Sequence, residues 1–446
     1  MALPPGPREP ALIQSWRFWR RPIDTLVTWH KRYGDAFTVR FAIVGTGVYV
    51  ADPQAVREMF TGDQSNLHAG EANAPVAPVL GDHSVLVLDG PEHLRQRRLL
   101  LPPFQGSAVK GFRTLIRDVA EAEVDTWRTG SQFPIRERMR ALTFEVICRA
   151  VFGVTESDRI ARLHAAMMAV ADMAWAIYIP PRLRRDLGRL SPWGQFQRRL
   201  RRIDALLYEE IARRRGEHDL DERTDVLSLL LRARDEDDQP MTDVELRDEL
   251  MTMLAAGHET TATGLAFAFD LLLHHPAELE RLRAAVEAGD DAYVDAVATE
   301  TLRLRPVIDA AERTLKEPRT IAGWDLPEGV KVYPAIGLIH RREDLYPQAH
   351  EFRPQRFLGT NTESYTWIPF GGGIRRCIGA ALAQAKMSEV LRVVIAGTEL
   401  RAVWPELDPG VLRGVTVSPR HGVPVEVVAK RAPVTPRTRS ATPTLA

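Results

Sequence analysis

The chain has 446 residues, of which 45% are hydrophobic and 26% charged, the ordinary composition of a globular protein. Lysine plus arginine totals 59 and aspartate plus glutamate totals 59, so no net charge draws the whole molecule toward nucleic acid or an anionic membrane. The 2 cysteines exclude a disulfide framework and fit a reducing cytoplasm. They also exclude a fused iron–sulfur domain, which needs about four.

The two ends of the chain and its most apolar stretch give no sign of a membrane protein. Residues 1–10 are rich in proline and lack the layout of a signal peptide or anchor. The stretch 163–179 is interrupted by His164 and Asp172 and falls short of the ~20 apolar residues of a spanning helix. Without an internal linker, we expect one domain over residues 1–430, a disordered tail over 431–446, no membrane span and a cytoplasmic location.

The first predicted elements are a helix, a hairpin and a capped helix. A helical pattern runs over 22–32, and alternating apolar residues over 37–41 and 48–50 predict two strands joined by a glycine turn. Asp52 followed by Pro53 is a strong signal for the start of the next helix.

Most of the chain from 91 to 289 is predicted to be helical. In 191–215 one apolar stripe lies beneath many arginines, which we interpret as a solvated face. Thr242 begins a capping box, and the helix after it continues to Leu273, long enough to cross a domain. Residues 319–336 predict a second hairpin, with its turn at Pro327-Glu328-Gly329.

The densest chemical signal is the segment Phe-Gly-Gly-Gly-Ile-Arg-Arg-Cys-Ile-Gly, from Phe370 to Gly379, which precedes a helical pattern over 380–396. Glycines permit positive φ and let the backbone approach a flat ligand. Cys377 stands where the loop enters the helix, so N–H groups and the helix dipole favour its thiolate. A dinucleotide-binding loop would need glycine at Arg376 and a preceding strand. An inert buried cysteine is the other alternative.

This segment closely resembles the signature of the cytochrome P-450 family, Phe-Gly-x-Gly-x-Arg-x-Cys-x-Gly. The residues that match its fixed positions are Phe370, Gly371, Gly373, Arg375, Cys377 and Gly379. The resemblance implies that Cys377 is the axial thiolate ligand of the iron in haem b and that the other matching residues surround this cofactor. A thiolate ligand pushes electron density onto iron and favours O–O cleavage.

A second motif, Ala-Gly-His-Glu-Thr-Thr, begins at Ala256 in the long helix. Thr260 stands four residues later, so its hydroxyl can bond the Ala256 carbonyl and open the helix locally. A plain kinked core helix is the alternative. The resemblance implies that Ala256 borders the haem and that Glu259 and Thr260 relay protons to dioxygen at the iron. Ala262 excludes a His-Glu-x-x-His zinc site.

A third motif pairs Glu300 with Arg303 on one helix face. At a protein surface such a pair is common and contributes only about 0.3–0.5 kcal/mol. Arg356 follows downstream. The resemblance implies that the three residues form a Glu–Arg–Arg cluster that locks the scaffold under the haem, a structural role.

A fourth motif places His93 and Arg97 four residues apart on one helix face, which suits them to hold an anion. The resemblance implies that this face meets the haem propionates and that Arg313 and Arg375 are the other propionate partners. Taken singly, each arginine is as readily explained as a surface residue.

The resemblance covers about residues 1–430 and implies a mainly α fold with a smaller β region, a triangular helical prism that encloses haem. It implies a monooxygenase, an oxidoreductase that activates dioxygen with two externally supplied electrons and hydroxylates or epoxidises a small molecule. Because no flavin or ferredoxin segment is present, the electrons come from a separate ferredoxin or flavodoxin with an NAD(P)H-dependent reductase. Arg98 and Arg376 are candidates for the docking face. We expect a monomer that binds no nucleic acid.

By resemblance, the substrate pocket is lined by residues 67–87, 167–179, Ala255, Val307 and Ile308. Their side chains are mostly small or apolar, which favours a lipophilic substrate such as a terpenoid, steroid or fatty acid.

Three further residues have simpler interpretations. Asp309 is either an anchor for a substrate hydroxyl or amine or, as we favour, an exposed loop aspartate. His340 follows an apolar strand and is interpreted as a packed or capping histidine. Cys148 lies in an apolar helix and is predicted to be core.

Three other functions are compatible with parts of the pattern. A haem-thiolate enzyme that consumes peroxide or rearranges its substrate needs no electron partner, but the pair of Glu259 and Thr260 argues against it. A haem sensor or carrier does not need that pair. A helical protein without cofactor is the third alternative.

Overall fold

The computed structural model describes residues 2–359 and 365–431, so the predicted tail lies outside the described residues except for Arg431. The longer helices are α1 (Ala11–Arg20), α2 (Pro22–Tyr33), α3 (Pro53–Thr61), α6 (Gly90–Leu100), α7 (Gly106–Asp125), α8 (Ile135–Phe152), α9 (Ser157–Ala171), α10 (Pro192–Arg215), α12 (Asp243–His274), α13 (Pro276–Ala288), α14 (Asp291–Leu304) and α16 (Ala380–Gly397). The shorter ones are α4 (Ala69–Asn73), α5 (Ala77–Leu80), α11 (Val226–Arg232) and α15 (Ile336–Ile339).

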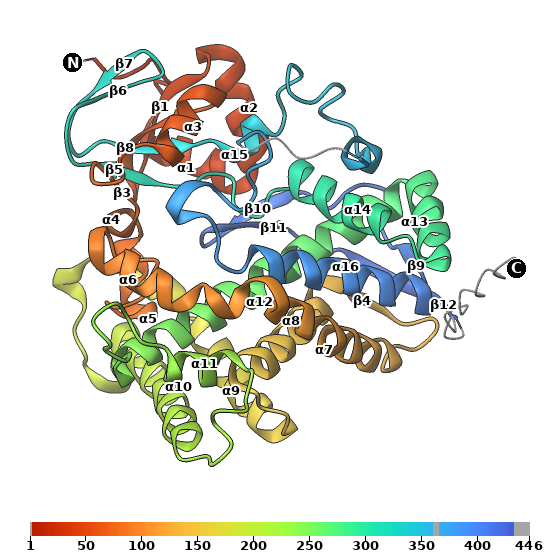
Figure 1. Cartoon of the computed structure of the whole chain (residues 1–446). Coiled ribbons are helices and arrows are strands. Elements are labelled where there is room, and N and C mark those ends of the chain that lie inside the picture. The colour runs from red at the N-terminus through yellow and green to blue at the C-terminus, as the bar shows by residue number, and fades with distance from the viewer. Residues whose placement is uncertain (1, 360–364, 432–446) are drawn as a thin grey trace, which may run out of the picture.

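The strands are short and gather in four sheets. Their bounds are β1 (Ala36–Phe41), β2 (Gly45–Val50), β3 (Leu67–His68), β4 (Gln132–Pro134), β5 (Arg313–Leu315), β6 (Arg319–Ile321), β7 (Trp324–Leu326), β8 (Lys331–Pro334), β9 (Thr398–Ala402), β10 (Gly410–Arg413), β11 (Thr416–Pro419) and β12 (Pro424–Lys430). The largest sheet has the order β1-β2-β8-β5-β3 and packs with the N-terminal helices at one end of the molecule (Figure 1). The prediction of a mainly α fold with a smaller β region is confirmed.

The long helix α12 runs through the middle of the helical region and contacts α8, α10, α14 and α16 (Figure 1). The predicted capping box is present, because the Thr242 hydroxyl accepts from the Glu245 N–H at 3.2 Å and the Glu245 carboxylate accepts from the Thr242 N–H at 2.7 Å. Every residue from Thr261 to Leu272 is buried, so the second half of α12 is core on all sides.

The predicted N-terminal hairpin is confirmed, with β1 and β2 antiparallel and Phe37 opposite Tyr49. Asp52 caps α3 by accepting from the Ala55 N–H at 2.7 Å. Cys148 is fully buried, as predicted. His340 is also fully buried, and its Nε2 accepts from the Ile368 N–H at 2.9 Å, which confirms a packed histidine.

The predicted turn of the second hairpin is wrong. β6 and β7 pair around Ala322 and Gly323, which both have positive φ as a tight two-residue hairpin turn requires. The predicted turn residues instead lead the chain into β8, which pairs with β2 and β5 of the large sheet. Ala-Gly is a weak turn signal in sequence, and the stronger Pro-Glu-Gly signal marks a different bend.

The helix α10 buries its predicted apolar stripe, but one of its arginines is not solvated. Arg214 is fully buried and donates to the Asp225 carboxylate, to the Ser228 hydroxyl at 2.7 Å and to the Phe152 carbonyl. One stretch, Ser157–Tyr178, is apolar and long enough for a membrane span by composition alone. This is weak evidence, and the stretch is divided between α9 and a short 3-10 turn.

The Glu–Arg–Arg cluster joins Glu300 and Arg303, which are fully buried in the C-terminal part of α14, to Arg356, whose side chain is 13% exposed. Arg303 donates to both oxygens of Glu300, at 2.7 and 2.9 Å, and Arg356 donates to the same carboxylate at 3.1 Å. Arg303 also donates to the carbonyls of His340 and Ala349, which lie in the segment after β8. The cluster therefore joins three separate parts of the chain.

Removing one member of this cluster should lower the free energy of unfolding far more than the loss of the same ion pair at a protein surface. We expect Glu300→Ala to lower the free energy of unfolding by about 3–5 kcal/mol, because it leaves two guanidinium groups without their buried carboxylate. The control is Arg401→Ala, whose side chain is 67% exposed and pairs with Glu426, and which should cost less than about 1 kcal/mol. Equal losses in urea unfolding would contradict this interpretation.

Candidate functional site

The loop before α16 owes its shape to glycine. Gly371 and Gly373 have φ of 67° and 60°, a region that disfavours other residues. A Cβ at Gly373 would lie 1.7 Å from the carbonyl oxygen of Phe60 in α3, so the loop packs there without side-chain bulk. At Gly371 and Gly379 a Cβ would meet no atom within 4 Å. Those two positions therefore border open space in the described structure.

Cys377 is held at the end of this loop, where its N–H donates to the Phe370 carbonyl at 2.9 Å. Its side chain is accessible, unlike that of Cys148. Surrounding protein raises the pKa of the Cys377 thiol, and a hydrogen bond from the Gly379 backbone and the charges of Arg376, Arg97 and Lys386 oppose that shift. The donors that favour a thiolate are therefore in place around one accessible sulfur.

The four predicted propionate partners come together from three parts of the chain. His93 and Arg97 lie on α6, Arg313 begins β5, and Arg375 precedes the cysteine. Burial and the charges of Arg375, Arg97 and Arg313 lower the pKa of His93 to about 3, so these groups share one site.

This cationic site holds more positive than negative charge. Asp89 binds Arg375 at 2.5 Å, whereas Arg97 donates to the Arg376 carbonyl at 2.7 Å and Arg313 to the Glu312 carbonyl at 2.8 Å. Burial, and then Arg375, lower the pKa of Arg313 to about 10, and its Nε has no hydrogen-bond partner in the described structure. Uncompensated guanidinium groups of this kind fit carboxylates such as the two haem propionates.

Glu259 and Thr260, the predicted catalytic pair, lie on α12. The Thr260 hydroxyl donates to the Ala256 carbonyl at 2.7 Å, which is the predicted bond, although the helix remains continuous there. Ala256 is exposed, while Leu254 and His258 on either side of it are buried. The Glu259 carboxylate lies against α8, where it pairs with Arg136 and, at 2.9 Å, with Arg140. Neither arginine was foreseen, because no local pattern links them to Glu259.

The donor set fits one sulfur ligand better than a protein-only metal centre. Among residues 2–359 and 365–431, no three His, Cys, Asp or Glu residues gather as a metal site. An accessible thiol, glycines without side-chain bulk and guanidinium groups nearby together fit haem b, to which Cys377 would supply the iron ligand from the protein.

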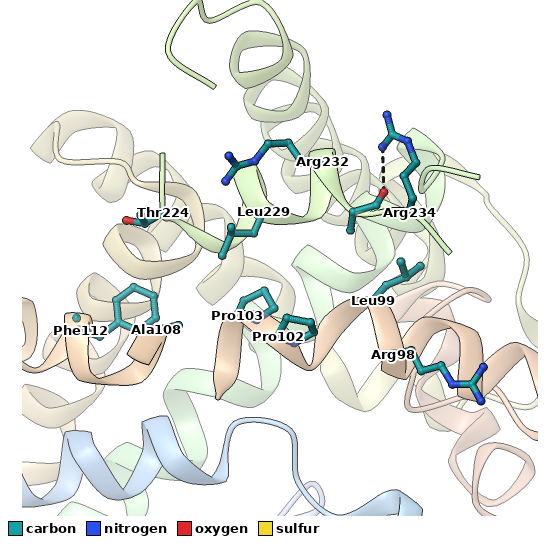
Figure 2. Close-up of a pocket in the computed structure, with 12 residues that line it drawn as sticks. Arg98, Leu99, Pro102, Pro103, Ala108, Phe112, Thr224, Leu229, Arg232 and Arg234 are labelled. Atoms are coloured by element: carbon teal, nitrogen blue, oxygen red, sulfur yellow. Dashed lines mark hydrogen bonds between the residues drawn. The ribbon is translucent and has the colours of Figure 1, made fainter. Parts of the chain in front are cut away.

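The predicted pocket residues do not line the cavity of about 740 Å³ that lies between the end of α6, the start of α7 and α11. Figure 2 shows residues that line this cavity, among them Arg98, Arg232 and Arg234. Ala255 is half-buried, Val307 joins the main core, and Ile308 packs against the core that contains Phe60.

The preferred interpretation of Asp309 is wrong. Its side chain is 6% exposed, and its Oδ2 has no hydrogen-bond partner in the described structure. Burial raises the pKa of Asp309 to about 6, against hydrogen bonds from its own backbone and from Ala310. Its charge also raises the pKa of the buried Tyr49, so it lies near the large sheet. Folding of the segment after α14 against that sheet is not readable from local sequence.

Comparisons with known proteins agree with this geometry. The family model described as Cytochrome P450 matches residues 4–397. Cytochrome P450 135B1 of Mycobacterium tuberculosis is 42% identical over 441 residues, which cover 97% of this chain and 92% of the relative. Cytochrome P450 137 of the same organism is 39% identical over 396 residues, covering 89% and 83%.

Solved structures share the fold. Retinoic acid bound cyanobacterial CYP120A1 has a TM-score of 0.82 at 23% identity, covering 96% of this chain and 100% of that one. The cytochrome P450DA heme domain has a TM-score of 0.86 at 23% identity, covering 97% and 98%. The chain belongs to the cytochrome P450 family. It is a haem-b-binding oxidoreductase with monooxygenase activity.

The buried Asp309 predicts a pH-dependent stability. Its folded pKa of about 6 lies above the ordinary value of 3.8, so the folded state loses stability as pH rises through this window. Asp309→Asn cannot ionise, so its gain over wild type should grow with pH, by up to about 3 kcal/mol between about pH 4 and pH 7. Urea unfolding at both pH values measures this gain. The exposed Asp118→Asn is the control, and a gain that does not change with pH would contradict the assignment.

Proposed function

We propose that this protein hydroxylates or epoxidises a lipophilic small molecule with dioxygen and two electrons from a separate ferredoxin or flavodoxin and its NAD(P)H-dependent reductase. The observation that carries the proposal is the accessible Cys377 thiol, near the charges of Arg97, Arg376 and Lys386, in described residues that hold no cluster of three or more metal-ligating side chains. Haem bound there supplies dioxygen activation at an iron whose thiolate ligand favours O–O cleavage.

Each residue of the site has a distinct task in this proposal. Cys377 binds the iron. The propionates are held by the three cations near His93, which are Arg97, Arg313 and Arg375. Thr260 presents its hydroxyl at the accessible part of α12 beside Ala256. Glu259, whose carboxylate is 23% exposed between Arg136 and Arg140, takes protons from solvent and passes them toward Thr260.

Substrate recognition remains at the level of class. Ala255, Val307 and Ile308 are apolar side chains near the site, which supports a lipophilic substrate such as a terpenoid, steroid or fatty acid. We also retain the predictions of a monomer and a cytoplasmic location.

The first test is the iron–sulfur bond. Purified wild-type protein, reduced under carbon monoxide, should show the red-shifted absorption of a thiolate-ligated haem, and Cys377→Ala should lose it. Cys148→Ala is the matched control, because that cysteine is fully buried and should leave the band intact apart from a loss of stability. A wild-type protein without the band, or a variant that keeps it, refutes the assignment.

The second test separates oxygen activation from binding. With a substrate found by a Soret-shift screen of lipophilic compounds, Thr260→Ala should lower product formation by about 10²-fold while NAD(P)H oxidation continues and hydrogen peroxide rises. Thr299→Ala is a suitable control, because Thr299 is, like Thr260, a half-buried helical threonine that donates to a backbone carbonyl four residues earlier. Unchanged product per NAD(P)H would remove Thr260 from the proton path.

The third test concerns electron delivery. Arg98 is 60% exposed but already pairs with Glu236, whereas Arg376 is exposed with no carboxylate partner in the described structure. We expect Arg376→Glu to slow reduction by the partner and to weaken its salt dependence, and Arg401→Glu on β9 to have no effect. Equal reduction rates in stopped flow would place the docking face elsewhere.

A further inference from the structure

Three successive carbonyls of α12 lie within hydrogen-bond distance of side-chain donors. Thr260 donates to the Ala256 carbonyl at 2.7 Å and Lys386 to the Gly257 carbonyl at 2.6 Å. The Thr143 hydroxyl of α8 lies 3.0 Å from the His258 carbonyl and shares its one hydrogen with the Met139 carbonyl at 2.8 Å. A helix normally offers such carbonyls only to N–H groups four residues later. The turn beside the proposed oxygen site is therefore held from three sides.

Lys386 is the unusual member of this group. It lies on α16, nine residues after Cys377, and its side chain is 2% exposed. No carboxylate pairs with its ammonium in the described residues, and burial lowers the pKa of Lys386 to about 7. Burying a cation without a carboxylate is costly, so a methionine of similar volume would stabilise the fold better.

The charged groups around Lys386 are few. Cys377 favours the charged form of Lys386. The charges of Lys386 and Arg140 lower the pKa of the buried His258 of α12, and the charge of Glu259 raises it. The neighbouring Glu389 of α16 is turned toward Arg113 and Arg117 of α7. Ser388 is bound to Asp295 of α14. In the described residues the ammonium therefore has the Gly257 carbonyl as its hydrogen-bond acceptor, and Cys377 interacts with it electrostatically.

We propose that Lys386 is a positioning residue that ties the thiolate side of the haem to the proposed oxygen-binding turn of α12. Its ammonium holds the Gly257 carbonyl and so fixes the turn that carries Glu259 and Thr260. The same charge stabilises the thiolate and the reduced iron behind it. This inference rests on the proposed function and links its two parts, the iron-binding thiolate and the proton path on α12.

The test compares three variants in the haem-loaded protein. Lys386→Met removes the charge and the donor, Lys386→Gln removes the charge but keeps an N–H donor, and Lys430→Met is the control. Lys430 also donates to a backbone carbonyl, that of Asp125 at 2.9 Å, but it is exposed. The measurements are the haem reduction potential from about pH 6 to pH 9, hydrogen exchange in residues 255–262, and the ratio of peroxide to NAD(P)H.

Lys386→Met should keep the red-shifted carbon monoxide band and equal or exceed wild-type stability. Its reduction potential should fall, because the variant lacks a positive charge near the iron-binding cysteine. Exchange in residues 255–262 should be faster and peroxide should rise severalfold. Lys386→Gln should restore slow exchange without restoring the potential, and Lys430→Met should match wild type.

Different failures are distinguishable. If both Lys386 variants change stability but leave potential, exchange and peroxide at wild-type values, Lys386 only fills space and the inference is wrong. If Lys386→Met does not fold, the haem reduction potential of Lys386→Gln alone tests the inference. A wild-type protein that lacks the thiolate band refutes the proposed function instead, and exchange in the haem-free variants then still reports whether Lys386 holds the turn.

Discussion

Buried positive charge without matching carboxylate is the constraint on which the site depends. Arg97, Arg313 and Lys386 each donate to a backbone carbonyl, and of the predicted propionate partners only Arg375 forms an ion pair within the described residues, with Asp89. Desolvation of such cations is costly unless an anion binds them. Two propionates and one thiolate would supply three negative charges, so that haem binding would also stabilise the fold.

Two parts of α12 differ in how they resolve the conflict between core packing and chemistry. The residues from Thr261 to Leu272 are buried on all sides and are mainly apolar or small, with Asp270 as the exception. The first half of α12 breaks that rule between Ala256 and Thr260, where the side chains are exposed, polar or charged. Local violations of an otherwise consistent pattern are expected at functional sites, because activity there outweighs stability.

Sequence predicted those features whose causes are local. The capping box at Thr242, the cap at Asp52, the glycine loop before Cys377 and the bond from Thr260 to Ala256 each depend on residues within a few positions of one another. The misplaced hairpin turn has a tertiary cause: the segment after Leu326 pairs with β2 and β5. Local turn propensity contains no information about those distant strands.

The parts of the site that were missed involve residues brought together from distant segments. The sequence predicts surface positions for Asp309 and Arg214, because their sequence neighbours are polar or lie in loops. Both residues are buried, Asp309 near the large sheet and Arg214 against the start of α11. Lys386 is a sharper case. In α16 it stands among alanine, methionine and leucine, so the pattern alone predicts a core position occupied by the wrong residue type. Such a mismatch is itself a signal, because a chain that places a lysine where a methionine would pack must gain something that packing does not provide.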